Sequence, residues 1–142
     1  MWSKAPFTFD TNVVFYAFTG AGPKAFAAQA VIERADFISV QVLNEFANAV
    51  RRKQDRPWPD IRLALDRLRL AVPAILPLDE SAHLEATRLA ERYQIGLYDA
   101  LVLAVALIGE ARTFYSEDLQ HGMLIDESLR IVNPFLPGAL DQ

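Results

Sequence analysis

The stretch LYDALVLAVALIGEARTFYSED, residues 97–118, gives the clearest indication of the fold of this chain. Its first half is an apolar segment of helical length that ends at Gly109, and Thr113–Tyr115 has the composition of a short strand. Asp99 is the only charged residue in positions 93–109, a segment that otherwise favours burial. A lone buried carboxylate is costly unless it is paired or holds a metal. The stretch therefore predicts a buried helix, a strand and an acidic site.

Strand-like runs alternate with helical patterns on both sides of this stretch. The expected strands are Phe7–Phe9, Phe37–Val40, Ala74–Leu76, Thr113–Tyr115 and Arg130–Val132. The expected helices are Val13–Phe18, Pro23–Arg34, Val42–Lys53, Asp60–Leu70, Glu80–Tyr93 and Tyr98–Ile108. Arg56–Pro59 is expected to form a turn, and Gly96 to stop a helix. The alternation predicts a three-layer α/β domain with a central, mostly parallel sheet flanked by helices.

Size and composition bound the class of protein. The 142 residues fit one domain, 1–142, and about half of them are apolar, which is ample for a single core. The chain has no cysteine, so disulfides and zinc–thiolate sites are excluded. The segment MWSKAPFTFD has no apolar signal-peptide core, and the run 97–108 is too short to span a bilayer. We expect a soluble, cytoplasmic protein.

The charge balance points to a specific acidic site. The net charge of −4 comes from 14 basic and 18 acidic residues. Four acids lie where apolar runs give way to helices or turns: Asp10, Glu45, Asp99 and Asp118. Without those four, the count is 14 against 14. This composition argues against a strongly basic nucleic-acid binder, but it allows a metal-centred enzyme that acts on nucleic acid.

The four acids are expected to meet at one edge of the sheet. Ligands of open α/β sheets bind at the carboxyl ends of the strands, which is where these acids fall. Each has an ordinary alternative: Asp10 and Asp99 as helix N-caps, Asp118 in a turn, and Glu45 at a solvated edge position. Carboxylates about 6 Å apart repel by roughly 3 kcal/mol per pair at an effective dielectric near 20. A set of four therefore calls for a cation, and oxygen ligands suit Mg²⁺ or Mn²⁺.

Four short motifs, taken in order, resemble those of the PIN-domain ribonucleases, in particular the VapC-like toxins of VapBC toxin–antitoxin systems. They are Phe9-Asp10-Thr11-Asn12, Asn44-Glu45-Phe46, Leu97-Tyr98-Asp99-Ala100 and Tyr115-Ser116-Glu117-Asp118. Each motif alone is weak, but the four together cover nearly the whole chain. A haloacid-dehalogenase-like phosphatase fits less well, because Asn12 stands where its second aspartate belongs.

The resemblance implies a set of site residues and partners. Its metal-binding and catalytic acids correspond to Asp10, Glu45, Asp99 and Asp118, and its supporting residues to Asn12 and Ser116. It further implies a homodimer, an RNA substrate and inhibition by a separate antitoxin. Gln120-His121-Gly122 departs from the aromatic residue that many members have after the fourth acid, so Glu117 remains an alternative to Asp118.

Basic residues are concentrated in positions 51–69, which hold seven of the 14. They either form two solvated helix faces or supply phosphate contacts beside the acids. Arg52 is the best candidate for a phosphate contact, because it lies two helical turns after Glu45 on the same face. The sequence therefore predicts a Mg²⁺- or Mn²⁺-dependent endoribonuclease. The alternative is a non-catalytic module of the same fold that binds RNA or protein.

Overall fold

The computed structural model describes residues 5–141 and contains six helices and six strands within that range. The helices are α1 (Thr11–Thr19), α2 (Pro23–Arg34), α3 (Val40–Gln54), α4 (Trp58–Ala71), α5 (Glu80–Tyr93) and α6 (Leu97–Ile108). The strands are β1 (Phe7–Phe9), β2 (Ile38–Ser39), β3 (Ile75–Leu76), β4 (Thr113–Tyr115), β5 (Leu124–Ile125) and β6 (Leu129–Val132).

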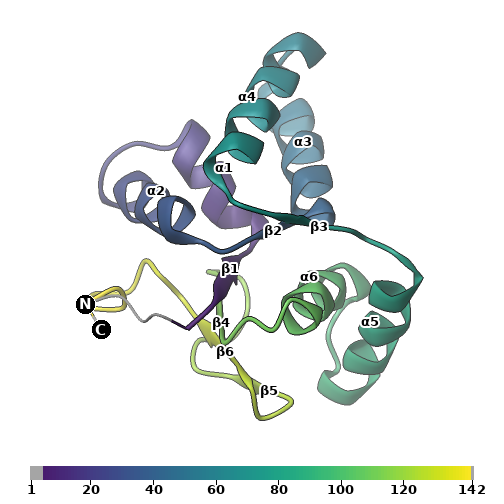
Figure 1. Cartoon of the computed structure of the whole chain (residues 1–142). Coiled ribbons are helices and arrows are strands. Elements are labelled where there is room, and N and C mark those ends of the chain that lie inside the picture. The colour runs from purple at the N-terminus through teal and green to yellow at the C-terminus, as the bar shows by residue number, and fades with distance from the viewer. Residues whose placement is uncertain (1–4, 142) are drawn as a thin grey trace.

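The central sheet has the order β1-β4-β6-β5 and is parallel except for the β5–β6 pair. Helices lie on both sides of it (Figure 1). The predicted α/β fold with a mostly parallel sheet is therefore confirmed. The register pairs Phe9 with Tyr115, so Asp10 and Ser116 are the next residues at the carboxyl ends of two neighbouring strands.

Two features of the strands differ from the prediction. β2 and β3 form a separate parallel pair instead of joining the main sheet, and Val40 begins α3 instead of ending a strand. Ser39 explains that early start, because its hydroxyl accepts a hydrogen bond from Val42 N at 3.2 Å and so caps the helix. β5 was not predicted, because a two-residue strand carries almost no periodic signal.

Two predicted breaks fall elsewhere. The prediction of a turn at Arg56–Pro59 is wrong for its last two residues, because Trp58 and Pro59 already belong to the first turn of α4. Proline is tolerated there because the first N–H groups of a helix have no intrahelical acceptor. Gly96 does not stop α5 but precedes α6 as its N-cap, and Gln94 ends α5 with a left-handed backbone (φ 54°).

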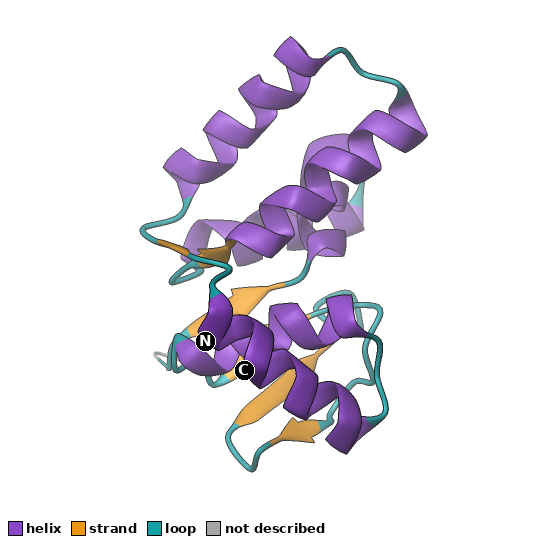
Figure 2. Cartoon of the chain, turned by 90° about the vertical axis from the view of Figure 1, so that its right-hand side faces the viewer, coloured by secondary structure: helices purple, strands orange, loops and turns teal. Residues whose placement is uncertain are grey.

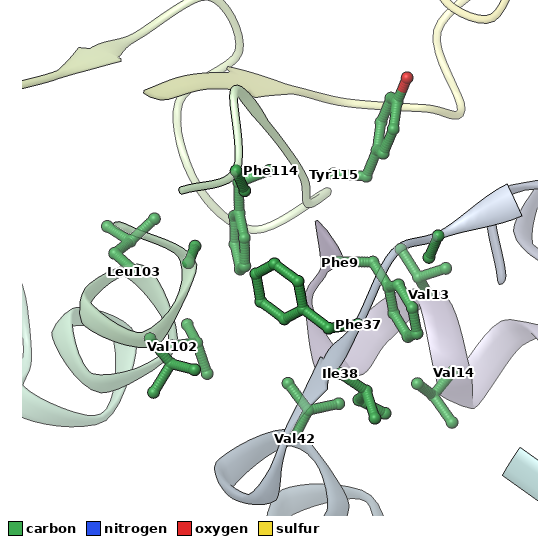
Figure 3. Packing of buried hydrophobic residues seen from close by; sticks show 14 of the residues in the cluster. Phe9, Val13, Val14, Phe37, Ile38, Val42, Val102, Leu103, Phe114 and Tyr115 are labelled. Carbon is green, nitrogen blue, oxygen red and sulfur yellow. The ribbon is translucent and has the colours of Figure 1, made fainter. Parts of the chain in front are cut away.

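The core lies between the sheet and the surrounding helices. Phe9, Phe37 and Phe114 gather at its centre, with Val102 and Leu103 of α6 on one side and Val13 and Val14 of α1 on the other (Figure 3). Seven consecutive residues of α6, from Ala100 to Ala106, are buried, as the apolar run predicts.

The α3–α4 hairpin extends away from the sheet (Figure 2). Its helices pack through apolar residues at helical spacing, including Phe46 and Val50 of α3 and Ile61 and Leu68 of α4. The opposite face of α3 is left to solvent or to a ligand. Within residues 5–141, no helix combines the length and apolar character needed to cross a membrane.

Candidate functional site

Asp10 stands at the junction of β1 and α1. Its backbone N–H donates to Tyr115 O at 2.9 Å, which extends the β1–β4 pairing by one residue. Its carboxylate then turns back as the N-cap of α1, and Oδ1 accepts from Thr11 N at 2.8 Å. The helix-cap interpretation of Asp10 is therefore correct, but it accounts for only one of the two carboxylate oxygens.

The second oxygen of Asp10 faces the end of β4. The Ser116 hydroxyl, itself fully buried, donates to Asp10 Oδ2 at 2.8 Å. Burial raises the pKa of Asp10 to about 7; the negative charges of Glu45 and Asp118 add to the effect, and the Ser116 and Thr11 hydrogen bonds oppose it. No ion pair to Asp10 occurs among the described residues. A carboxylate only 5% exposed and without a protein cation suits a bound metal ion.

Asn12 connects two of the acids. Its amide nitrogen lies 3.4 Å from Asp10 Oδ2 and 3.2 Å from Asp118 Oδ2, and 3.4 Å from the Ser116 hydroxyl. Its amide oxygen accepts from the backbone N–H of Glu117 at 3.2 Å. Asn12 and Ser116 therefore both contact Asp10, and their role as supporting residues stays a prediction.

Glu45 projects from the second turn of α3 toward the same region. The Thr11 hydroxyl donates to Glu45 Oε1 at 3.2 Å, and Gln41 Nε2 donates to Oε2 at 2.8 Å. Burial raises the pKa of Glu45, and the charges of Asp99 and Asp118 raise it further. Glu45 is therefore a partly buried acid within electrostatic range of two others, not a solvated edge residue.

Asp99 differs from the prediction in its burial. It lies in the first turn of α6 and is exposed, whereas the next residue, Ala100, is fully buried. Leu97 and Tyr98, the two residues before Asp99, are exposed as well, and the burial of α6 begins only at Ala100. Partial desolvation still raises the pKa of Asp99, and the charge of Asp118 adds to it. The acid that the fold buries is Asp10.

Asp118, and not its neighbour Glu117, faces the other acids. The charge of Asp118 raises the pKa of Asp10, Glu45 and Asp99. Glu117 turns away, and its carboxylate accepts from the Tyr16 hydroxyl at 3.1 Å and from Lys24 Nζ at 3.0 Å. Within residues 5–141, however, no three acidic or histidine side chains are close enough to hold one metal ion as they stand.

A groove of about 460 Å³ opens beside these acids between α1 and α3. Glu45, Arg52 and Asp118 all line it. Glu45 and Arg52 lie on the same face of α3, as their spacing predicted. The groove also contains Thr11 of the first motif and Lys53, one of the seven basic residues in positions 51–69. Three lining residues were not predicted: Asn48 on α3, and Phe15 and Tyr16 on α1. Asn48 and Lys53 follow Glu45 at helical spacing, as Gln41 precedes it, so tracing that face along α3 would have found them.

Other basic residues of the hairpin have a different environment. Arg51 contacts Asp55 and Arg69 contacts Asp66, and Arg56 lies 4.0 Å from Asp60, all in exposed pairs within one helix or at its end. These three arginines therefore fit the interpretation as solvated helix faces. Arg52 lines the groove beside the acids, and a phosphate contact by Arg52 stays a prediction.

The donor set of this site is made of oxygen atoms. Its four carboxylates come from the N-cap of α1, the second turn of α3, the first turn of α6 and the loop after β4, and amide and hydroxyl groups support them. Such ligands suit Mg²⁺ and Mn²⁺, and the burial of Asp10 without a basic partner in the described chain makes a cation favourable there.

Comparison with known proteins gives a consistent result. The sequence model described as PIN domain matches residues 7–121, which contain all four acids. No curated protein matches the chain at a significant level.

Solved structures share the fold. A toxin–antitoxin complex from Klebsiella pneumoniae superposes with a TM-score of 0.63 at 20% identity, covering 92% of this chain and 98% of that chain. VapBC2 from Rickettsia felis, bound to a DNA fragment from its promoter, superposes with a TM-score of 0.64 at 18% identity, covering 89% of this chain and 98% of that chain. Mycobacterium tuberculosis VapC20, a Sarcin-Ricin loop cleaving toxin, superposes with a TM-score of 0.64 at 16% identity, covering 79% of this chain and 89% of that chain.

Proposed function

Because the chain belongs to the PIN-domain family, we propose that it is a metal-dependent endoribonuclease and the toxin of a toxin–antitoxin pair. The observation that carries the proposal is the buried Asp10 carboxylate, which lies within electrostatic range of Glu45 and Asp118 and has no basic partner in the described chain. Two of the solved neighbours, the toxin–antitoxin complex and the Sarcin-Ricin loop cleaving toxin, support the same proposal.

Asp10, Glu45, Asp99 and Asp118 would hold Mg²⁺ or Mn²⁺ in this proposal. When bound, such an ion activates a water molecule for attack on a phosphodiester and stabilises the charge that develops on the phosphate. The chain needs no side-chain nucleophile, and a carboxylate not fully used as a ligand can orient the attacking water.

The surrounding residues orient the acids and bind the substrate. Ser116 and Thr11 fix the Asp10 carboxylate, and Gln41 fixes that of Glu45. Arg52 and Lys53 line the groove beside Glu45, where cationic side chains can contact the RNA backbone. Lys53 Nζ also lies 5.2 Å from the centre of the Phe15 ring. The groove therefore offers positive charge next to the acids, and phosphate contacts there position the strand without reading its sequence.

The decisive experiment substitutes single acids. Asp10→Asn and Asp99→Asn are expected to abolish cleavage of an RNA substrate by purified protein in Mn²⁺, because each removes a charged ligand. Circular dichroism and the melting temperature establish that both variants are folded. Full activity in both variants would contradict the nuclease assignment.

The proposed partners need a separate test. We expect co-expression with the neighbouring reading frame to yield a tight complex in which RNA cleavage is suppressed, and light scattering to show a dimer of this chain. The toxin–antitoxin complex from Klebsiella pneumoniae and VapBC2 from Rickettsia felis support this expectation. A monomer that cleaves RNA but acquires no inhibitor would instead indicate a housekeeping nuclease. A cytoplasmic location stays a prediction.

The alternative is a PIN-fold module that binds RNA or protein without cleaving it. Retention of all four acids argues against this alternative, because binding alone does not require a repulsive acidic set. RNA binding that is unaffected by chelator, in a protein with no cleavage in any divalent metal, would favour it.

A further inference from the structure

Lys24 and Tyr16 hold both carboxylate oxygens of Glu117. Lys24, on α2, places Nζ 3.0 Å from Glu117 Oε2, and the Tyr16 hydroxyl of α1 donates to Oε1 at 3.1 Å. Lys24 Nζ also lies 3.4 Å from the Tyr16 hydroxyl oxygen. The consecutive helices α1 and α2 therefore both contact a carboxylate that lies 101 and 93 residues further along the chain.

Aromatic rings fix the position of the Lys24 ammonium group. Its Nζ lies 4.7 Å from the centre of the Tyr16 ring and 5.5 Å from that of Phe135. The two rings pack edge to face with centres 5.1 Å apart. Cation–π contacts and an edge-to-face pair both favour this one arrangement. Lys24 is therefore held in place although its side chain is half exposed.

The backbone of Glu117 connects this anchored side chain to the acidic site. Its N–H donates to Asn12 Oδ1 at 3.2 Å, so the amide group of Asn12 must turn its nitrogen the other way. That nitrogen then faces Asp118 Oδ2 and Asp10 Oδ2. The orientation of the Asn12 amide follows from this network, since only its oxygen can accept from a backbone N–H.

We propose that Lys24 and Tyr16 are positioning residues for the acidic site, which act by anchoring Glu117 and so fixing the Asn12 amide between Asp10 and Asp118. This inference rests on the proposed function, because its consequence for activity requires that these acids hold a metal. It gives Glu117 a role as an anchor, not as a ligand. Outer partners that orient metal ligands typically change metal affinity by about 10- to 100-fold.

Two substitutions remove the anchor and keep the packing. Lys24→Met keeps the aliphatic stem, and Tyr16→Phe keeps the ring against Phe135. Matched controls come from a second network of the same kind, in which Arg88 and Tyr93 contact Asp126. Arg88→Met removes the ion pairs of Arg88 with Asp126 and with Glu85. Tyr93→Phe removes a hydroxyl bonded to the Asp126 carboxylate, so both variants weaken the contact between α5 and the β5–β6 turn.

Metal titration provides the main test. In Lys24→Met and Tyr16→Phe, the Mn²⁺ concentration that gives half of the melting-temperature increase should rise about tenfold. For Lys24→Met, whose position lies outside the groove, kcat at limiting Mn²⁺ should fall while KM for RNA stays within about twofold, since the anchor acts on the acids and not on the substrate. Lys24→Arg, which keeps the positive charge, should have a Mn²⁺ midpoint and kcat close to those of the parent. Both control variants should match the parent.

Hydrogen exchange of the Glu117 amide, measured with chelator, separates the two proposals. Both variants should lose protection at this amide, and neither control should. If protection is lost but the parent neither responds to Mn²⁺ nor cleaves RNA, the proposed function fails and the anchor stands. Unchanged protection, an unchanged Mn²⁺ midpoint, or an effect of Lys24→Met on KM alone would overturn the positioning role.

Discussion

The hydroxyl of Ser116 donates to Asp10 Oδ2 at 2.8 Å and joins residues 106 positions apart in the chain. The contact exists because β1 and β4 are parallel neighbours that end in register, at Phe9 and Tyr115. It places a buried carboxylate, stabilised by one hydroxyl and one backbone N–H, at the carboxyl end of the sheet. The behaviour of Asp10 therefore reports on the whole site.

The pH dependence of metal-free stability should identify Asp10. Its pKa is raised from 3.8 to about 7, so the folded state holds the proton more tightly than the unfolded chain. The stabilising contribution is complete below pH 4 and is lost as pH rises through 7, a change of roughly 4 kcal/mol in the free energy of unfolding. Urea unfolding with chelator between pH 4 and pH 8 measures it. Asp10→Asn should lose far less stability over this range. Parallel curves of unfolding free energy against pH for the parent and this variant would contradict the raised pKa of Asp10.

Metal binding should separate Asp10 from Asp99. Mn²⁺ at 100 times its dissociation constant should stabilise the parent by about 2.7 kcal/mol. With chelator at pH 8, Asp10→Asn should raise the melting temperature more than Asp99→Asn, because water screens the exposed Asp99 and not the buried Asp10. Both variants should lose most of the Mn²⁺ response. A larger increase in melting temperature for Asp99→Asn than for Asp10→Asn would show that burial does not determine the strength of the repulsion between the acids.

Arg52 should contribute to RNA binding, whereas its neighbour Arg51 should not. Arg52→Gln removes a cation from the groove and should raise KM for RNA up to about fivefold, with kcat nearly unchanged, as expected for an exposed charge contact. Arg51→Gln removes the same charge, but Arg51 contacts Asp55 and Arg56 O. Steady-state kinetics at two salt concentrations distinguish them. Equal effects would mean that net charge, and not the groove, governs binding.

A side chain at Gly109 should destabilise the fold. A Cβ there would lie 2.5 Å from Phe37 Cζ and 2.6 Å from Leu76 Cδ1, so these two side chains would have to move. Gly109→Ala should destabilise the fold by about 1–3 kcal/mol through overpacking. Gly96→Ala, where a Cβ meets no atom within 4 Å, is the matched control and should cost less. Denaturant unfolding of both variants measures the difference.

Much of the fold could be predicted from local patterns. α2 and α5 have the predicted bounds, and β1 and β4 do as well, because apolar spacing, prolines and capping residues act over a few neighbours. The separate β2–β3 pair and the short β5 could not be predicted, since strand pairing depends on distant partners. The burial of Asp99 was predicted wrongly, because an apolar neighbourhood does not reveal which way one side chain points.

The sequence by itself determined the alternation of strands and helices and the acids at their junctions, because periodicity and residue type are local properties. Only the tertiary structure decided how those acids are arranged. Parallel pairing of β1 with β4 brings Ser116 to Asp10, and the turn after β4 directs Asp118 toward the acids and Glu117 toward Lys24. Solvent access is likewise a tertiary property: the fold buries Asp10 and exposes Asp99, although the apolar context of Asp99 predicted its burial.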